Sequence, residues 1–195
     1  MSGRIADIAI DSNNENVWYV AVGSGGVWKT KNAGTTWMPL TDNMPFYSTG
    51  SITIDPNDSS RIWVGTGENV AGRHVGIGHG IYLSKDSGST WDDMGLNKSE
   101  HISKIIVHPD NSNIIWVASQ GPLWNSGGDR GLFMSTDGGN SWSNKLYVNE
   151  WTGVTDIIID PTNPDILYAA TWQRHRNVAS LIDGGPGTSI YKSID

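Results

Sequence analysis

A fixed internal spacing recurs four times along the 195 residues, and it limits the fold more than any other feature of the chain. Segments of alternating apolar residues end in a polar residue, and an aromatic residue follows each end after eight positions. The ends are Asp11, Asp55, His108 and Asp160, and the aromatic residues are Tyr19, Trp63, Trp116 and Tyr168. Turn-forming stretches such as "DPNDSS" and "DPTNPD" lie between them. Each pair therefore predicts two strands joined by a tight hairpin.

A third and a fourth strand are expected in each unit. The segments "GGVWKT", "GIYLS", "GLFMS" and "SIYKS" supply the third strand, and in the first three units a tryptophan nine residues beyond its aromatic residue opens the fourth. Units of four strands that repeat every 44 to 53 residues have the size of a β-propeller blade. We therefore predict an all-β chain of about four propeller blades, each a four-stranded antiparallel sheet. A β-sandwich is the alternative, but irregular hairpins would not keep these spacings constant.

The predicted domain is a single partial β-propeller over residues 1–195. The expected blades are 4–43, 48–96, 101–147 and 153–195, the last without its outer strand. Closed propellers have roughly four to eight blades and pair their terminal strands to seal the ring. We therefore expect a segment of a larger propeller, whose remaining blades are partners of these four.

A polar octapeptide links the third strand to the fourth. It occurs as "TKNAGTTW", "SKDSGSTW" and "STDGGNSW", and it begins again as "SID". In such a turn Asp or Asn accepts backbone N–H bonds, Gly permits positive φ, and Trp buries its ring with the indole N–H available to a partner. A catalytic role for the acid is the alternative, but the turn recurs in every unit and its first copy carries an amide. The residues expected to be structural are Asn32, Gly34, Trp37, Asp86, Gly88, Trp91, Asp137, Gly139, Trp142 and Asp195.

Composition argues against several classes of partner. Thirteen Lys and Arg against twenty Asp and Glu give a net charge of −7, so we expect no nucleic acid partner. No apolar stretch approaches the roughly 18 residues that span a bilayer, so no membrane span is expected. Without cysteine the chain has no disulfide and no thiolate metal site. We expect no cofactor.

The link between the second and third strands is the part of the repeat that varies. Its flanking aromatic residues are 9, 19, 17 and 23 positions apart in the four units. Variable loops on a rigid scaffold carry binding and catalysis, and these loops share a propeller face with the links between blades, opposite the octapeptides. Their aromatic and charged side chains suit sugar rings, although Trp rings that merely cover blade ends are the alternative. The expected ligand-binding residues are Arg73, His74, His79, His101, Trp124, Arg130, Trp151, Trp172, Arg174 and Arg176.

The octapeptides look like the Asp-box, or bacterial neuraminidase repeat, of sialidases, sortilin-type propellers and xyloglucanase-like glycoside hydrolases. Longer segments such as "GGVWKTKNAGTTW", "WVGTGEN" and "TGVTDIIIDPTNPDILYAA" resemble large secreted bacterial proteins with a sortilin N-terminal-like propeller, often called glycosyl hydrolases. The resemblance covers essentially the whole chain. It implies a secreted, periplasmic or cell-surface location. It also implies a polysaccharide or glycoconjugate, or else a protein or peptide, as ligand.

The spacing of residues along the sequence does not identify which carboxylates would be catalytic. Glycoside hydrolysis normally needs two carboxyl groups across the scissile bond, and Glu68, Asp129 and Glu150 are the candidates by placement. Xyloglucanase-like enzymes carry an aspartate shortly before a Gly-Gly in the first blade, where this chain has Gly23 and Ser24. No metal site is expected, because the histidines lack a compact ligand spacing. A glycan-binding or glycan-cleaving propeller and a non-catalytic, sortilin-type propeller that binds protein or peptide both stay open.

Overall fold

The computed structural model describes residues 3–70 and 72–193, and it contains four antiparallel β-sheets of four strands each. None of these residues is helical. The prediction of an all-β fold built from propeller blades is confirmed. One residue of the expected octapeptide set, Asp195, lies outside the described residues.

The first three sheets follow chain order, so that each strand pairs with the strand before it. The first sheet contains β1 (Ile5–Ile10), β2 (Trp18–Val22), β3 (Gly26–Thr30) and β4 (Met38–Pro39). The second contains β5 (Thr49–Asp55), β6 (Asp58–Thr66), β7 (Ile81–Ser84) and β8 (Asp92–Asp93). The third contains β9 (Ile102–His108), β10 (Asn111–Ser119), β11 (Gly131–Ser135) and β12 (Ser143–Leu146).

The fourth sheet departs from this order. It contains β13 (Thr152–Asp160), β14 (Asn163–Arg176), β15 (Leu181–Asp183) and β16 (Ile190–Ser193). The strand β14 is long enough to pair with β16 through Leu167–Ala170 and then with β15 through Arg174–Arg176. The sequence predicted a long, variable loop here. The structure instead has a β-hairpin, whose turn is held by the Asn177 side-chain oxygen accepting from the backbone N–H groups of Ala179 and Ser180.

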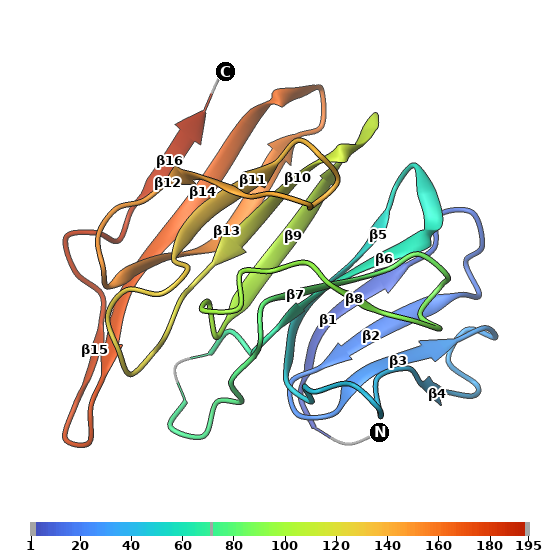
Figure 1. The fold of residues 1–195 in the computed structure, drawn as a ribbon, viewed down its shortest axis with the longest axis horizontal. Helices are drawn as coiled ribbons and strands as arrows, with labels where there is room; N and C mark the ends of the chain where they lie inside the picture. The colour runs from blue at the N-terminus through green and yellow to red at the C-terminus, as the bar shows by residue number, and fades with distance from the viewer. Residues whose placement is uncertain (1–2, 71, 194–195) are drawn as a thin grey trace.

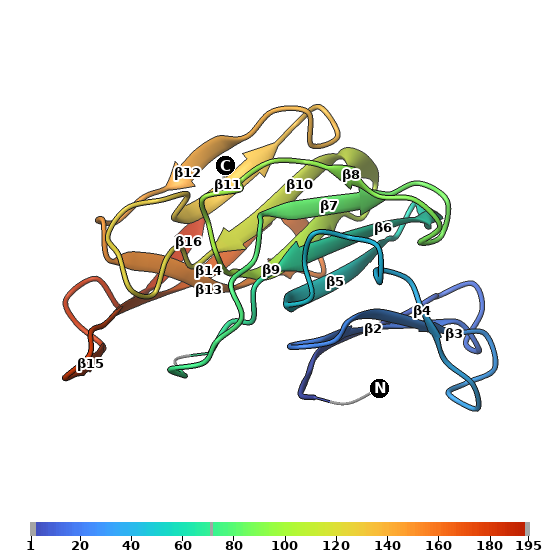
Figure 2. The same cartoon turned by 60° about the horizontal axis from the view of Figure 1, so that its bottom comes forward.

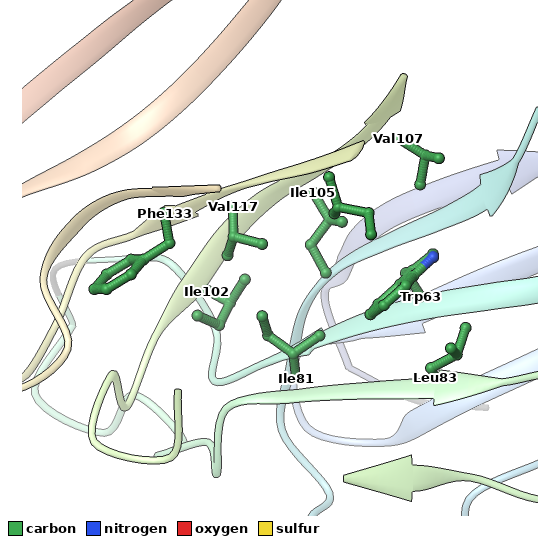
Figure 3. Close-up of a cluster of buried hydrophobic side chains, with 9 residues drawn as sticks. Trp63, Ile81, Leu83, Ile102, Ile105, Val107, Val117 and Phe133 are labelled. Carbon is green, nitrogen blue, oxygen red and sulfur yellow. The ribbon is translucent and has the colours of Figure 1, made fainter. Parts of the chain in front are cut away.

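The sheets stand side by side in chain order, with the first and the fourth at the two ends (Figures 1 and 2). The strand β5 contacts both β1 and β9, and β9 contacts β13, so the first strands of successive sheets are neighbours. A hydrophobic cluster fills each of the three spaces between sheets. In the middle cluster, Trp63, Ile81 and Leu83 of the second sheet face Ile105 and Val117 of the third (Figure 3).

The two outer sheets expose positions that the inner sheets bury. The first strand of each sheet carries an isoleucine three residues before the end of its segment. In the second, third and fourth sheets this isoleucine packs against the preceding sheet. This isoleucine is 1% exposed at Ile105 but 53% exposed at Ile8. At the other end of the molecule, Ile158 is 61% exposed, whereas its counterpart Ile106 packs against the cluster between the third and fourth sheets. Each outer sheet therefore has one apolar face that no described residue covers.

The three octapeptide turns, residues 30–37, 84–91 and 135–142 and here called the box turns, share one hydrogen-bond pattern. In the second copy the Asp86 carboxylate accepts from the Ser89 and Thr90 backbone N–H groups, and from the Ser84 and Thr90 hydroxyls at 2.8 and 2.6 Å. Asn32 keeps the same frame, because its Oδ1 accepts from the Thr36 N–H at 2.9 Å.

Each box turn is also tied to the hairpin between the first two strands of its own sheet. The residue after the acid or amide donates its backbone N–H to a hairpin carbonyl five residues beyond the end of the first-strand segment. The pairs are Ala33 with Asn16, Ser87 with Ser60, and Gly138 with Asn113, at 2.8 to 3.1 Å. The box turn therefore fixes one end of each of the first three sheets.

The tryptophans of the second and third box turns donate their indole N–H groups to the preceding sheet. Trp91 donates to the Leu40 carbonyl at 3.3 Å, and Trp142 donates to the Met94 carbonyl at 2.7 Å. The glycine of the same turn lies against that sheet as well, since a Cβ at Gly139 would lie 2.6 Å from the Trp63 ring. The box turn therefore joins neighbouring sheets in addition to reversing the chain.

Substitution of equivalent isoleucines will measure this difference in packing. Ile105→Ala removes three buried carbons between two sheets, and we expect it to lower the free energy of unfolding by about 2–5 kcal/mol. Ile8→Ala, at the exposed end face, should change it by less than about 0.5 kcal/mol. Urea unfolding followed by tryptophan fluorescence compares the two, and equal losses would show that the end face is covered in solution.

The box-turn acids predict a loss of stability in acid. Hydroxyl and backbone hydrogen bonds hold the pKa of Asp86 and that of Asp137 at about 2, below the ordinary 3.8. Because folding lowers these pKa values, the stabilisation is present above the ordinary pKa and is lost as the pH falls from about 4 to about 2. The Asp86→Asn and Asp137→Asn double variant, which imitates Asn32, should show a flatter melting temperature between pH 5 and pH 2. Parallel profiles for wild type and variant would contradict this expectation.

Candidate functional site

The long links between the second and third strands gather at the end of the sheets away from the box turns. The segment between β6 and β7 and the hairpin of β14 and β15 both project from this end (Figure 1). They meet there, because Arg73 donates to the Val178 carbonyl at 3.1 Å and Arg174 donates to the Val70 carbonyl at 3.1 Å. Segments more than a hundred residues apart therefore form one surface.

Arg130 anchors the link between β10 and β11. The side chain is buried, and its guanidinium donates to the backbone carbonyls of Gln120, Pro122, Asn125 and Gly127, all within that link. A fifth bond of 3.4 Å reaches the Trp151 carbonyl, in the segment before β13. Burial lowers the pKa of Arg130 to about 10, so the guanidinium is still charged at neutral pH. The sequence placed Arg130 among the ligand-binding residues, and its hydrogen bonds all go to the backbone of the protein.

Trp151 links the third and fourth sheets at this end. Its carbonyl accepts from Arg130 and from the backbone N–H of Arg174, and its ring lies 4.0 Å from the His175 ring, centroid to centroid. The neighbouring Trp172 ring lies 5.1 Å from the charged carbon of Arg174. Four of the predicted site residues, Arg130, Trp151, Trp172 and Arg174, thus lie in one assembly. His175 belongs to it too.

Glu68 is buried and held by an arginine near the N-terminus. Arg4 donates from Nε to Oε1 at 2.6 Å and from Nη2 to Oε2 at 2.5 Å. The carboxylate lies against the first sheet, because a Cβ built at Gly23 would be 2.5 Å from Oε1. Both carboxylate oxygens are occupied by Arg4, so this pairing argues for an electrostatic role of Glu68 rather than proton transfer.

His101 lies beside Glu68, and it is buried and uncharged. Burial, and secondly the charge of Arg174, lower the pKa of His101 to about 3, while a hydrogen bond with the Glu68 backbone opposes the shift. The imidazole is therefore neutral at pH 7. It can serve as a hydrogen-bond partner, but not as a cation for an anionic ligand.

The other predicted residues are spread over the rim. Asp129 accepts from the Lys98 backbone N–H at 3.0 Å, and the Glu150 side chain is exposed. Trp124, His74 and His79 are also exposed, and Arg176 is half-buried with its backbone N–H on the Leu123 carbonyl. Within residues 3–70 and 72–193, no three His, Asp or Glu side chains are grouped as a metal site would require. The same residues include no helix long and apolar enough to cross a membrane.

A pocket of about 430 Å³ lies between the second-to-third strand link of the first sheet and the segment that leads to β5. Its walls include Gly25, Gly26, Phe46, Tyr47 and Asp42. Tyr47 is exposed, and its carbonyl accepts the Gly26 N–H at 2.8 Å. The sequence analysis did not point to Asp42. The short link of the first unit gave no length signal there.

The sheets and their shared loop surface define a β-propeller repeat protein. Comparison with known sequences agrees with this class. A sequence model of the Sortilin-Vps10 family, described as "Sortilin, neurotensin receptor 3", matches residues 25–155. The chain belongs to this family.

Three similar proteins are much longer than this chain. The chain is 23% identical over 186 residues to an oligoxyloglucan-reducing end-specific xyloglucanase of Emericella nidulans, covering 85% of this chain and 21% of that protein. It is 27% identical over 228 residues to a xyloglucanase of Hypocrea jecorina, covering 100% and 25%. The GH74 enzyme of Niastella koreensis superposes with a TM-score of 0.70 at 20% identity, covering 96% and 27%. The chain thus spans only about a fifth to a quarter of the length of these relatives.

The anchoring role of Arg130 can be tested by stability. Arg130→Met leaves several buried carbonyls without a donor, and we expect it to lower the free energy of unfolding by about 3 kcal/mol. The control Arg73→Met removes one exposed hydrogen bond and should cost less than about 0.5 kcal/mol. Chemical denaturation of both variants checks the ranking, which an equal effect of the two would refute.

Proposed function

We propose that this chain is part of an extracytoplasmic propeller that binds glycans through the loops between second and third strands and the links between blades. The observation that carries the proposal is the assembly around Trp151, where aromatic rings and buried cations from three segments meet. Sugar rings stack their CH faces on aromatic side chains and hydrogen-bond through their hydroxyls. The xyloglucanase relatives support a polysaccharide as the ligand class.

The surface offers two kinds of sugar contact. Trp124 is exposed on the rim close to the assembly, since its neighbour Leu123 accepts from the Arg176 backbone. Tyr47 and Asp42 place a ring beside a carboxylate in the pocket of the first sheet. A volume of about 430 Å³ falls within the range of small-molecule sites. An extended glycan could therefore contact several blades.

The same proposal extends to hydrolysis of the bound glycan, in which Glu68, Asp129 and Glu150 would supply the catalytic carboxyl groups. Measured release of reducing ends from xyloglucan would fall in Glu68→Gln, Asp129→Asn and Glu150→Gln variants if these groups act on the bond. Activity unchanged in all three would exclude this set. The hydrogen bonds of Glu68 and Asp129 favour binding over cleavage as the role of this segment.

A non-catalytic propeller that binds a protein or peptide is the second candidate function. The family description, which names a neurotensin receptor, favours it. The same face would then be used, and a peptide partner would co-purify through it. A competition experiment compares the two candidates. A glycan that does not displace a bound peptide cannot occupy the same site as the peptide.

Further blades are proposed to cover the two apolar end faces. Every inner sheet buries both of its faces against neighbours, and Ile8 and Ile158 are exposed where no neighbour is described. In a protein that carries a sheet before β1, Ile8→Asp should be as disruptive as Ile105→Asp. Tolerance of Ile8→Asp in such a protein would refute the contact.

The glycan proposal predicts a specific loss on substitution of one tryptophan. Trp124→Ala should weaken binding on a glycan array by roughly 10-fold, because one stacking platform is removed. Tyr168→Ala is the control, since Tyr168 is 38% exposed against 39% for Trp124 but lies on the end face of the fourth sheet. Equal losses in both variants, or no binding by the wild type to any polysaccharide, would count against the proposal.

A further inference from the structure

Two arginines near the segment Glu68–Val70 use their guanidinium edges differently. Arg4 presents Nε and Nη2 together to the Glu68 carboxylate. Arg174 uses Nη1, which donates to the Val70 carbonyl at 3.1 Å. Its Nε and Nη2 are buried and have no hydrogen-bond partner among the described residues. The unpaired edge of Arg174 is thus the same edge with which Arg4 holds a carboxylate.

An unpaired guanidinium edge at this depth needs an explanation. Arg174 is 0% exposed, and a buried donor without a partner is unfavourable, more so when the group is charged, because it has lost its hydrogen bonds to water. The Trp172 ring covers a face of the guanidinium at 5.1 Å, but a ring face does not replace hydrogen bonds in the plane of the group. The two parallel N–H groups of this edge match the two oxygens of a carboxylate.

The charges around Arg174 favour an anion. Arg130 is close enough that its charge, after burial, contributes to lowering the pKa of Arg174 to about 10. Arg130 itself donates its hydrogen bonds to neutral carbonyls, and the charges of Glu100 and Glu150 act on it without a hydrogen bond. The charge of Glu68 is already paired with Arg4. Asp183 acts on Arg174 from an exposed position.

Neutral polar atoms complete the surroundings. The Nδ1 atom of His101 and both amide atoms of Gln120 are buried and lack partners among the residues described. His101 lies within electrostatic range of Arg174, and its carbonyl accepts from the Gln120 backbone at 3.0 Å. Such atoms suit the hydroxyl groups next to a carboxylate on a sugar ring, because hydroxyls both donate and accept.

From these contacts we infer that Arg174 binds the carboxylate of an acidic sugar, a uronic acid unit of the glycan, with His101 and Gln120 beside the ring. This inference rests on the proposed glycan-binding function and adds the charge of the ligand to it. Both nitrogens are covered by protein, so binding requires side chains in front of them to shift, as is common at binding surfaces.

The test compares matched acidic and neutral probes. Glucuronate and glucose, and oligosaccharides that end in one or the other, are titrated into the wild-type chain by calorimetry. In parallel, NMR of the arginine Nε–H groups follows Arg174 directly, with acetate as a probe of the carboxylate alone. We expect the acidic oligosaccharide to bind roughly 10- to 100-fold more tightly than the neutral one, as for a charge-assisted bidentate pair. The Arg174 Nε–H signal should shift with glucuronate and acetate but not with glucose.

Two variants and one control sharpen the result. Arg174→Gln should remove the preference for the acidic probe, and Arg174→Lys, which keeps the charge without the paired edge, should retain only part of it. Arg61→Gln is the control, because Arg61 lies at the start of β6 and pairs with Asp55. It should leave the preference unchanged. If Arg174→Gln fails to fold, the wild-type NMR titration still decides.

The outcomes separate this inference from the function on which it rests. Equal binding of acidic and neutral oligosaccharides, with the Trp124→Ala loss intact, overturns the carboxylate site and keeps glycan binding. A shift of Arg174 with acetate, but no oligosaccharide that binds more tightly than acetate, supports the carboxylate site and removes the glycan. No response of Arg174 to acetate or glucuronate overturns the inference.

Discussion

Packing between neighbouring sheets is the interaction on which the rest of this structure depends. A four-stranded sheet of this kind has apolar side chains on both faces, so it is stable only when another sheet covers each face. The clusters around Tyr19, Trp63 and Val154 meet this requirement between the four sheets. The box turns strengthen it, because Trp91 and Trp142 hydrogen-bond to the sheet before their own. The free energy of folding of such a row of sheets is roughly a sum of terms for each sheet and for each interface between neighbouring sheets.

A scaffold fixed in this way leaves its variable links free to carry polar groups. The link that contains Arg130 needs a buried cation to satisfy its own carbonyls, and the same cation raises the local positive charge near Arg174. The structural requirement of this link and the proposed binding of a ligand thus act on neighbouring residues. A buried polar network is worth most when every member is satisfied. The unpaired atoms of Arg174 and Gln120 mark where this network is incomplete within the described residues.

Much of the fold could be predicted because its determinants are local. The eight-residue spacing from Asp55 to Trp63 reflects one hairpin, and the strands β5 and β6 pair across it as expected. The hairpin of β14 and β15 escaped prediction because its residues Arg174, His175 and Arg176 are all polar and give no apolar alternation. Its pairing depends on the Asn177 turn and on neighbours in space.

The site was harder to predict for a related reason. The composition of the loops pointed to segments that meet in the structure, including those of Trp151 and Arg174, but the partner of each side chain is set by tertiary contacts. Glu68 and Arg4 are 64 residues apart in sequence, and no spacing rule connects them. The sequence showed that Arg130 lies in a variable link, but could not show that its hydrogen bonds would all go to backbone carbonyls.

The pairing of Glu68 bears directly on how far the likeness to xyloglucanases extends. Those enzymes resemble this chain around Gly23, where their pattern has an acid shortly before the Gly-Gly. Here the Glu68 carboxylate occupies the space next to Gly23, so that even a Cβ at this position would come within 2.5 Å of Oε1. A side chain at position 23 would therefore require the Glu68 carboxylate to move from its present place. The negative charge at this place comes from the neighbouring sheet and is already paired with an arginine. It can shape the electrostatic field of a bound glycan, while any proton transfer to a glycosidic oxygen would require an unpaired carboxyl group supplied from elsewhere on the face.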